Sequence, residues 1–317
     1  MSKTLYTYLY GPVPSHRLGR SLGIDLVPYK ICSYDCIYCQ LGSTGNMTIT
    51  RKEYADNSQI MDELQSRLAS GLLPDYISLA GSGEPTLHSG IGDLIRSIKE
   101  ITAVPVAVLT NGSLLWMPEV QEALMAADLV LPSLDAGDPA TFQLVNRPDS
   151  SIDFHRMVQG LADFCHRFTG EVWLEVFLLA GINDDEPSVQ RIAALVEQIK
   201  PTRVQLNTVS RPTAETFAHG VAAMQLHHLS GLFKGNVECI SAMSASVETG
   251  ETFDFACQDA LIAFARRRPC TAQDLSIGLN LHLNDVLKQV RILADSGRLL
   301  ELSSRPGFYA APKPSPL

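Results

Sequence analysis

Three of the seven cysteines lie within eight residues, at Cys32, Cys36 and Cys39, in the stretch KICSYDCIYCQLG. Thiolates are soft ligands that favour zinc or iron–sulfur clusters. Structural zinc takes four protein ligands, and since no fourth cysteine lies nearby, His16 or His88 would have to complete the set. A [4Fe–4S] cluster held by these three cysteines would instead leave one iron free to bind a small molecule. Burial of all three in a core is disfavoured, because the loop between them is polar.

The elements that must position this loop alternate along the chain. Nearly continuous apolar runs of strand length occur at 21–28, 75–81, 104–110, 127–134, 172–180 and 202–209. Amphipathic segments lie between them, at 58–70, 90–101, 117–127, 154–168 and 186–199. Repetition of strand and helix predicts parallel strands joined by right-handed crossovers. Six units are fewer than the eight of a closed barrel, so we expect an α/β fold with a partial (β/α)6 TIM-like barrel; a doubly wound sheet is the alternative.

In both folds, functional groups gather at the C-terminal ends of the strands. The second expected strand ends in LAGSGEPTL, residues 79–87. Gly81, Ser82 and Gly83 expose backbone N–H and C=O groups there, without bulky side chains. Such a backbone edge can hydrogen-bond a small zwitterion, although an ordinary strand-to-helix turn would have the same composition.

The cysteine spacing, with the aromatic Tyr38 before the last cysteine, resembles the signature of the radical S-adenosylmethionine (SAM) superfamily. The resemblance covers roughly residues 10–210. It implies a [4Fe–4S] cluster on Cys32, Cys36 and Cys39 whose open iron binds SAM. One electron then cleaves SAM to methionine and a 5′-deoxyadenosyl radical, which abstracts hydrogen from a substrate. The resemblance also implies an electron donor such as flavodoxin or ferredoxin.

The same resemblance assigns the first SAM contacts. Tyr38 would pack near the adenine. The stretch with Gly81, Ser82 and Gly83 is similar to the GGEP motif that contacts the SAM amino group, with Ser82 in place of a glycine. Glu84 would order this loop or hold the amino group rather than act as a base.

Three further polar side chains follow expected strands. Asn111 comes after the third strand, where it could point at the barrel mouth or form a plain turn. Ser133 and Asp135 come after the fourth and share one face, because they alternate with Leu134. Both could hydrogen-bond the ribose or carboxylate of SAM, although an N-cap role for Asp135 or Asp138 on the next helix competes.

Three arginines are candidates for holding a substrate carboxylate or phosphate, and no other catalytic residue is assigned. Arg17 lies in GPVPSHRLGRSLG, residues 11–23, whose glycines and prolines predict a structured loop rather than a helix or strand. This lead-in could cover one end of the barrel and meet an anionic substrate, or be only a surface plug. Arg147 and Arg211 follow the fourth and sixth strands, where a surface salt bridge is an equal alternative.

The chain ends in a second expected domain, residues 253–317, after a barrel domain of residues 1–252 that includes the lead-in and a connecting segment. Helices are expected over QDALIAFARRR, CTAQDLSIG and LNDVLKQVRILADSG, with Thr271 as an N-cap and Gly278 and Gly297 closing the last two. RLLELSSRPGFYAA then reads as a strand, an Arg-Pro-Gly turn and a strand. Three helices and a hairpin predict a winged helix-turn-helix.

Charge differs between the two expected domains. From residue 257 onward, 8 Lys and Arg stand against 5 Asp and Glu, a balance of +3; the remainder has 17 against 29, a balance of −12. The acidic barrel argues against a phosphate-dense substrate. The winged helix could bind nucleic acid, a peptide or a protein, or serve only as packing. Its third helix carries Lys288 and Arg291 against Asp285 and Asp295, which is weak for a helix that reads a DNA groove.

GPVPSHRLGRSLGIDLVPYKICSYDCIYCQLG and AGSGEPTLHSGIGDLI resemble an uncharacterised group of radical SAM proteins, related more loosely to the enzymes that build the wyosine base of tRNA. No apolar run is long enough to cross a bilayer, and the N-terminus lacks the features of a signal peptide, so we expect a cytoplasmic location and no membrane partner. The expected function is that of a radical SAM enzyme with an unknown substrate. The alternative is an iron–sulfur redox-sensing regulator that binds nucleic acid through the winged helix.

Overall fold

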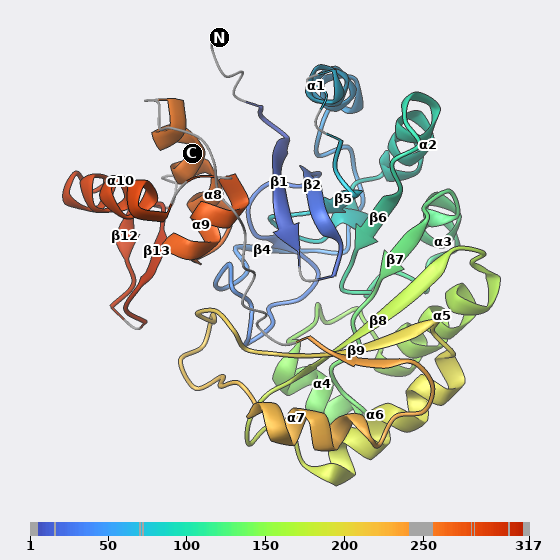
Figure 1. Ribbon diagram of the computed structural model, residues 1–317. Coiled ribbons are helices and arrows are strands. Elements are labelled where there is room, and N and C mark those ends of the chain that lie inside the picture. Colours follow the sequence, from blue (N-terminus) through green and yellow to red (C-terminus); the bar gives the residue numbers. More distant parts are fainter. Residues whose placement is uncertain are drawn as a thin grey trace.

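The computed structural model describes residues 6–15, 17–69, 71, 73–240, 256–279, 281, 283–303 and 305–312. An eight-stranded sheet forms the centre, with helices along its outer face and a smaller group of helices and strands beside β1 (Figure 1). His16 and the boundary expected between residues 252 and 253 lie outside the described residues.

All six expected strands are present: β2 (Gly19–Asp25), β5 (Tyr76–Ala80), β6 (Val106–Leu109), β7 (Leu129–Leu131), β8 (Glu171–Leu178) and β9 (Arg203–Thr208). They pair in parallel, each with the next along the chain, and β10 (Val237–Cys239) extends the sheet beyond β9. A doubly wound sheet reverses its strand order at a switch point. This order runs in one direction throughout, so the sheet is wound as an open, partial barrel.

Helices connect these strands: α1 (Asn57–Leu68), the 3₁₀ turn η1 (Pro85–Leu87), α2 (Ile91–Ile101), α3 (Pro118–Leu124), α4 (Pro139–Val145), α5 (Phe154–Arg167), α6 (Glu186–Ile199) and α7 (Ala223–Ser230). α4 lies outside every segment expected to be helical. It begins at Pro139, directly after Asp138, whose side chain accepts from Thr141 N, so the N-cap alternative for Asp138 is confirmed. Two short strands, β3 (Ile31–Cys32) and β4 (Asn46–Met47), pair with each other on either side of the cysteine motif. We call residues 30–48, which include both strands, the cysteine loop.

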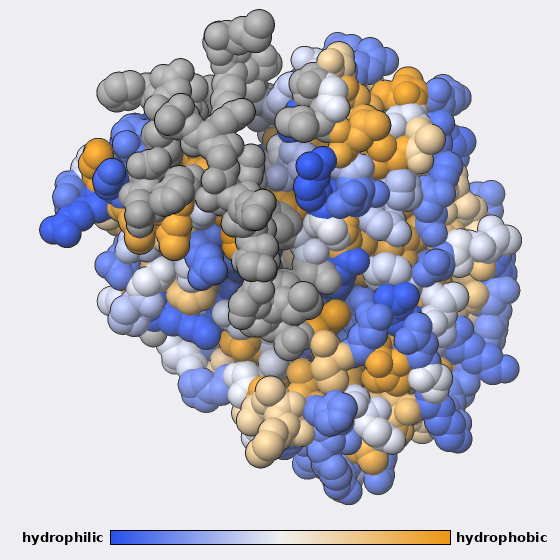
Figure 2. All heavy atoms as spheres, in the orientation of Figure 1, coloured by the Kyte–Doolittle hydropathy of each residue, from blue (hydrophilic) through white to orange (hydrophobic). Residues whose placement is uncertain are grey.

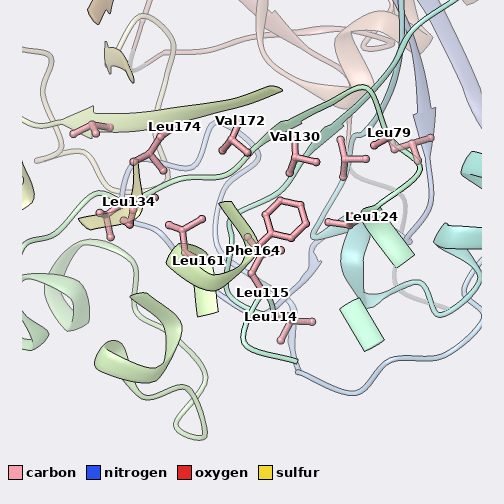
Figure 3. Close-up of a cluster of buried hydrophobic side chains, with 14 of the residues drawn as sticks. Leu79, Leu114, Leu115, Leu124, Val130, Leu134, Leu161, Phe164, Val172 and Leu174 are labelled. Atoms are coloured by element: carbon pink, nitrogen blue, oxygen red, sulfur yellow. The ribbon is translucent and has the colours of Figure 1, made fainter. Parts of the chain in front are cut away.

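Successive side chains of each strand point to opposite faces of the sheet. One set packs against the helices in the outer core, and the other set faces the inside of the barrel. Val172 and Leu174 of β8 pack with Leu161 and Phe164 of α5 in the main core (Figure 3). Trp173, between them, joins a smaller cluster on the inner face. The same alternation places Glu175 on the inner face beyond Trp173. Where the helices turn away from the sheet, the right-hand rim of the molecule is mostly hydrophilic (Figure 2).

The lead-in segment is a strand and not the loop expected from its prolines and glycines. β1 (Leu9–Ser15) pairs antiparallel with β2 at the edge of the sheet, with an irregular register between Tyr10 and Val13. Proline is tolerated at an edge or beside such an irregularity, because no ladder hydrogen bond is lost there. The turn after β1 places Leu18 in the inner cluster with Leu129 and Trp173, so the hairpin closes the N-terminal end of the barrel.

The C-terminal segment has its own core around Leu261, Leu275, Val290 and Leu293. Its elements are α8 (Ala256–Arg267), β11 (Cys270–Thr271), α9 (Ala272–Leu279), α10 (Leu283–Asp295), β12 (Leu300–Glu301) and β13 (Phe308–Ala310), with antiparallel strands in the order β11-β13-β12. We call residues 256–312 the C-terminal domain.

The glycine predictions for this domain were half right. Gly297 follows α10 in a left-handed conformation, as expected of a helix-ending glycine. Gly278 was expected to end its helix but lies inside α9, where a Cβ would come 2.4 Å from the Phe264 ring. Close packing between α8 and α9, and not helix termination, therefore explains this glycine. Among the described residues, no helix has the length and apolarity needed to span a bilayer.

We expect the substitution Gly160→Ala to destabilise the barrel. A Cβ on Gly160 of α5 would lie 2.3 Å from the backbone Cα of Trp116, which cannot move aside without shifting the start of α3. The free energy of unfolding, measured by chemical denaturation, should fall by about 1–3 kcal/mol, as is usual for overpacked cores. Gly45→Ala, at an exposed position with nothing within 4 Å, is the matched control. Equal stability of the two variants would contradict the prediction.

Candidate functional site

The cysteine loop packs directly on the loop that follows β5. Lys30 N donates to Ser82 O at 2.7 Å, and Glu84 N donates to Ile31 O at 3.1 Å. Cys32 is fixed further by the β3–β4 pairing, because Thr48 N donates to Cys32 O at 3.0 Å. The C-terminal ends of β2 and β5 therefore carry one continuous backbone unit that includes the first cysteine.

Each sulfur of Cys32, Cys36 and Cys39 has its own side-chain N–H donor. Asn111 Nδ2 lies 3.6 Å from Cys32 Sγ, and Asn146 Nδ2 lies 3.6 Å from Cys36 Sγ. Lys30 Nζ lies 3.2 Å from Cys39 Sγ. Lys30 is 5% exposed and has a left-handed backbone (φ 59°), which turns its buried ammonium back toward the loop.

This donor set suits an iron–sulfur cluster. Hydrogen bonds to the sulfur atoms and nearby charge are the means by which a protein holds and tunes such a centre. Without a metal, burial raises the pKa of Cys32 to about 12 and that of Cys36 well above its usual value, so metal binding must displace protons from these thiols. The described residues contain no group of three His, Cys, Asp or Glu side chains around one ion position.

His88 does not complete a zinc site with these cysteines. Its Nδ1 accepts from Tyr54 N at 3.1 Å and its Nε2 lies 2.9 Å from Asn57 Oδ1, so both ring nitrogens have protein partners. The ring is fully buried, and burial lowers its pKa. His88 thus anchors the chain before α1 as a neutral imidazole.

Glycines in the Ser82 loop, residues 81–84, allow two backbones and a carboxylate to meet. A Cβ at Gly83 would lie 1.9 Å from Ile31 O of the cysteine loop. A Cβ at Gly81, which has φ 131°, would lie 1.9 Å from Asp25 Oδ1. Asp25 in turn accepts from Ser82 N at 2.5 Å and from Ser82 Oγ at 2.9 Å. The two glycines are therefore required by close approach, and the serine by a hydrogen bond.

Glu84 ties together the loops that follow β5 and β6 through four hydrogen bonds that its carboxylate accepts. It is 2% exposed and accepts from Thr86 N at 3.0 Å, Thr86 Oγ1 at 2.5 Å, Thr110 Oγ1 at 2.6 Å and Asn111 N at 2.8 Å. Burial raises its pKa, and these hydrogen bonds oppose the rise. Of the two roles expected for Glu84, the geometry favours the ordering role.

Asn111 points toward the cysteine loop. Its amide nitrogen also donates to Ser33 Oγ at 2.9 Å, and its oxygen accepts from Ser113 N at 2.9 Å. Ser133 lies just after the C-terminal end of β7, and its backbone forms an isolated parallel β-bridge with Glu175 of β8. Contacts of Asn111 and Ser133 with SAM stay predictions.

Asp135 holds Tyr38 in place through a hydrogen bond to its hydroxyl. Its carboxylate accepts from Tyr38 Oη at 2.5 Å, Asn146 Nδ2 at 2.7 Å and Phe177 N at 3.0 Å. Burial raises the pKa of Asp135 to about 6. The Tyr38 ring stacks face to face on the Phe177 ring, with 4.1 Å between the ring centres, and this stacked pair forms an aromatic wall beside the cysteines. With three protein donors already in place, a supporting role for Asp135 is favoured over direct contact with SAM.

The three candidate arginines lie in different places. Arg17 pairs with Glu175 at 3.2 Å on the inner face of the barrel. Arg147 pairs with Glu215 at 2.5 Å. Arg211 makes a two-pronged pair with Asp274 of the C-terminal domain, at 2.9 and 3.0 Å. The salt-bridge alternative therefore holds for Arg147 and Arg211, and the structure does not bring the three together.

Several residues of the site escaped the sequence analysis. Four residues, from three parts of the chain, each contact a candidate residue: Asp25, Lys30, Asn146 and Phe177. Asn146 and Phe177 belong to no spacing pattern, and their roles depend on the pairing of distant strands. Asp25 and Lys30 both lie shortly before Cys32, so the proximity of a charge to a metal-binding loop was the one signal available.

A model of the radical SAM superfamily matches residues 26–192, from the end of β2 to the middle of α6. A UPF0026 protein of Helicobacter pylori is 34% identical over 318 residues, which cover 98% of this chain and 100% of the relative. A protein of Brachyspira hyodysenteriae named GTPase Obg is 42% identical over 301 residues, 95% of this chain and 44% of the relative. The chain thus spans less than half of that longer protein.

Solved structures show the same fold at low identity. A radical SAM methyltransferase from Sphaerobacter thermophilus gives a TM-score of 0.55 at 15% identity, covering 69% of this chain and 66% of its own. SuiB of Streptococcus suis, bound to its precursor peptide SuiA, gives 0.53 at 15% identity, covering 71% and 50%. From the superfamily match and the full-length relative, the chain belongs to the radical SAM superfamily and shares its family with the UPF0026 proteins.

Proposed function

We propose that this protein is a radical SAM enzyme that holds a [4Fe–4S] cluster on Cys32, Cys36 and Cys39 and binds SAM beside the Ser82 loop. Membership of the superfamily implies both cofactors. The observation that carries the residue assignment is the cysteine loop itself, with one N–H donor for each sulfur and backbone hydrogen bonds to the Ser82 loop. When bound, the cluster supplies the electron that splits SAM into methionine and a 5′-deoxyadenosyl radical, which takes a hydrogen atom from the substrate.

The chain's own residues bind and orient SAM in this proposal. Tyr38, stacked on Phe177 and held by Asp135, provides a flat surface for the adenine. The N–H of Ser82 is used by Asp25 and its C=O by Lys30. Within the motif, Gly81 and Gly83 are therefore left as the backbone contacts for the SAM amino group.

We further propose that the substrate lies on the inner face of the barrel. Arg17 and Glu175 face each other there, and Asn207 donates to Glu175 at 2.6 Å. One guanidinium nitrogen of Arg17, Nη1, is buried without a well-formed hydrogen bond, so a substrate acceptor could complete its coordination. Arg147 and Arg211 are weaker candidates, because their guanidinium groups already hydrogen-bond carboxylates, whereas the contact of Arg17 Nη1 with Glu175 lacks hydrogen-bond geometry.

The C-terminal domain has the helix and strand order of a winged helix, and we propose that it is one. Support comes from three helices with a strand between the first two, followed by a hairpin whose second strand lies in the middle of the sheet. A peptide, protein or nucleic-acid partner for it stays a prediction, as do a flavodoxin or ferredoxin donor and the looser kinship with wyosine-forming enzymes. The −12 balance of the barrel disfavours a phosphate-dense substrate.

Replacing one proposed ligand should abolish cluster assembly. After anaerobic reconstitution, Cys36→Ala should lose most of its iron and sulfide and should form no 5′-deoxyadenosine when reduced with SAM present, because one iron loses its thiolate. Cys165→Ala is the control, since Cys165 lies in the last turn of α5, just before the N-terminal end of β8, whereas the cysteine loop lies at the C-terminal ends of the strands. Full cluster content and SAM cleavage in Cys36→Ala would contradict the assignment. A wild-type protein that keeps the cluster, ignores SAM and binds DNA would support the redox regulator instead.

Removing the buried charge beside Cys39 should make the cluster harder to reduce. The Lys30 ammonium favours the more negative, reduced state, so Lys30→Met should lower the midpoint potential by tens of millivolts. Electron paramagnetic resonance during a redox titration measures this potential without any turnover. Lys52→Met, which removes a surface ammonium that lies over the Tyr54 ring, is the matched control. A potential unchanged in Lys30→Met would show that the 3.2 Å contact has no electrostatic effect on the centre.

A further inference from the structure

The last residue of α8, Arg267, reaches from the C-terminal domain into the edge of the barrel. Its Nε lies 3.6 Å from Asp25 Oδ2, and its guanidinium carbon lies 4.4 Å from the centre of the Tyr10 ring. Tyr10 lies against Gly23 of β2, where a Cβ would come 2.0 Å from the ring. Arg267 is thus stacked on an aromatic ring that is itself pressed onto the sheet, a geometry that favours a guanidinium over an ammonium.

Asp25 is the next link. It is the last residue of β2, and its carboxylate accepts hydrogen bonds from the N–H and the hydroxyl of Ser82. Burial raises the pKa of Asp25, while Ser82 and Arg267 oppose the rise. Arg267 Nε has no hydrogen bond of its own, so the Asp25 charge is its compensating partner. The Asp25 side chain is only 16% exposed, so loss of this cation would destabilise its carboxylate, which is the same carboxylate that fixes the Ser82 loop.

The C-terminal domain is attached to both sides of the open sheet. At the β1 edge, Val13 packs against the core of the domain. On the far side, the loop after β9 carries Arg211, which pairs with Asp274 of α9 and donates to Pro269 O at 3.1 Å. Figure 1 shows the domain beside β1, next to the opening of the barrel. Compared with these two attachments, the Arg267 contact is directly linked to the Ser82 loop, because the Asp25 side chain contacts both Arg267 and Ser82.

We propose that Arg267 is a positioning residue for SAM: by holding Asp25, it couples docking of the C-terminal domain to the geometry of the Ser82 loop. This inference rests on the proposed function. Because coupling between two equilibria is reciprocal, whatever separates Arg267 from Asp25 weakens SAM binding, and SAM in turn strengthens that contact. A partner of the C-terminal domain could therefore switch the radical site on or off without touching it.

Two measurements on the full-length, cluster-loaded protein test this. The first is the dissociation constant of SAM under anaerobic conditions. The second is hydrogen–deuterium exchange of the Ser82 loop without SAM. Arg267→Ala should raise the dissociation constant roughly tenfold, within the usual range of coupling effects, and should speed exchange at residues 81–84. Arg267→Lys, which keeps the charge and loses the planar stack, should fall between Arg267→Ala and wild type.

Asp274→Asn is the matched control, because it removes the ion pair with Arg211 at the far side and leaves the Arg267–Asp25 contact in place. It should leave both readouts near wild type, and in an Asp25→Asn background Arg267→Ala should add little. Unchanged affinity and exchange in Arg267→Ala would overturn the proposal. So would equal effects of Asp274→Asn and Arg267→Ala, since loosened docking would then suffice. If the wild type bound no SAM, the proposed function would fail. Hydrogen–deuterium exchange at residues 81–84 would still decide whether Arg267 orders the Ser82 loop.

Discussion

Two backbone hydrogen bonds between the cysteine loop and the Ser82 loop hold the site together. They join Lys30 to Ser82 and Ile31 to Glu84, and they form only because Gly83 has no side chain to collide with Ile31 O. Through them, the segment that carries Cys32 and the segment proposed to meet SAM become one rigid unit at the ends of β2 and β5. The aromatic wall of Tyr38 and the donors to the three sulfurs are arranged around this unit.

Buried carboxylates extend that unit to the rest of the barrel. Asp25, Glu84 and Asp135 each lie at or just beyond the C-terminal end of a strand and accept hydrogen bonds from neighbouring segments. Burying an ionised group is costly unless it is hydrogen-bonded or paired, so each is satisfied only when several loops are in place together. Glu84 links the ends of β5 and β6, while Asp135 links β7 with β8 and the cysteine loop. The site is therefore assembled by the sheet as a whole.

The fold was largely predictable, and its exceptions have physical causes. Buried parallel strands are apolar on both faces, so all six were visible as runs in the sequence, and the helices between them as amphipathic segments. The lead-in was misjudged because Pro12 and Pro14 are tolerated in β1 only as an edge strand, and sequence alone does not show which strand will be an edge. Gly278 was misjudged because its neighbour, Phe264, comes from another helix.

The sequence by itself determined the chemistry: the spacing of Cys32, Cys36 and Cys39 and the composition of the Ser82 loop are local properties, readable without a fold. Tertiary structure alone decided which groups surround that chemistry. Asn146 reaches Cys36, Phe177 meets Tyr38 and Arg267 faces Asp25 across separations of 110, 139 and 242 residues. Such contacts leave no periodic or spacing signal, because they depend on the register of parallel strands and on how one domain docks against another.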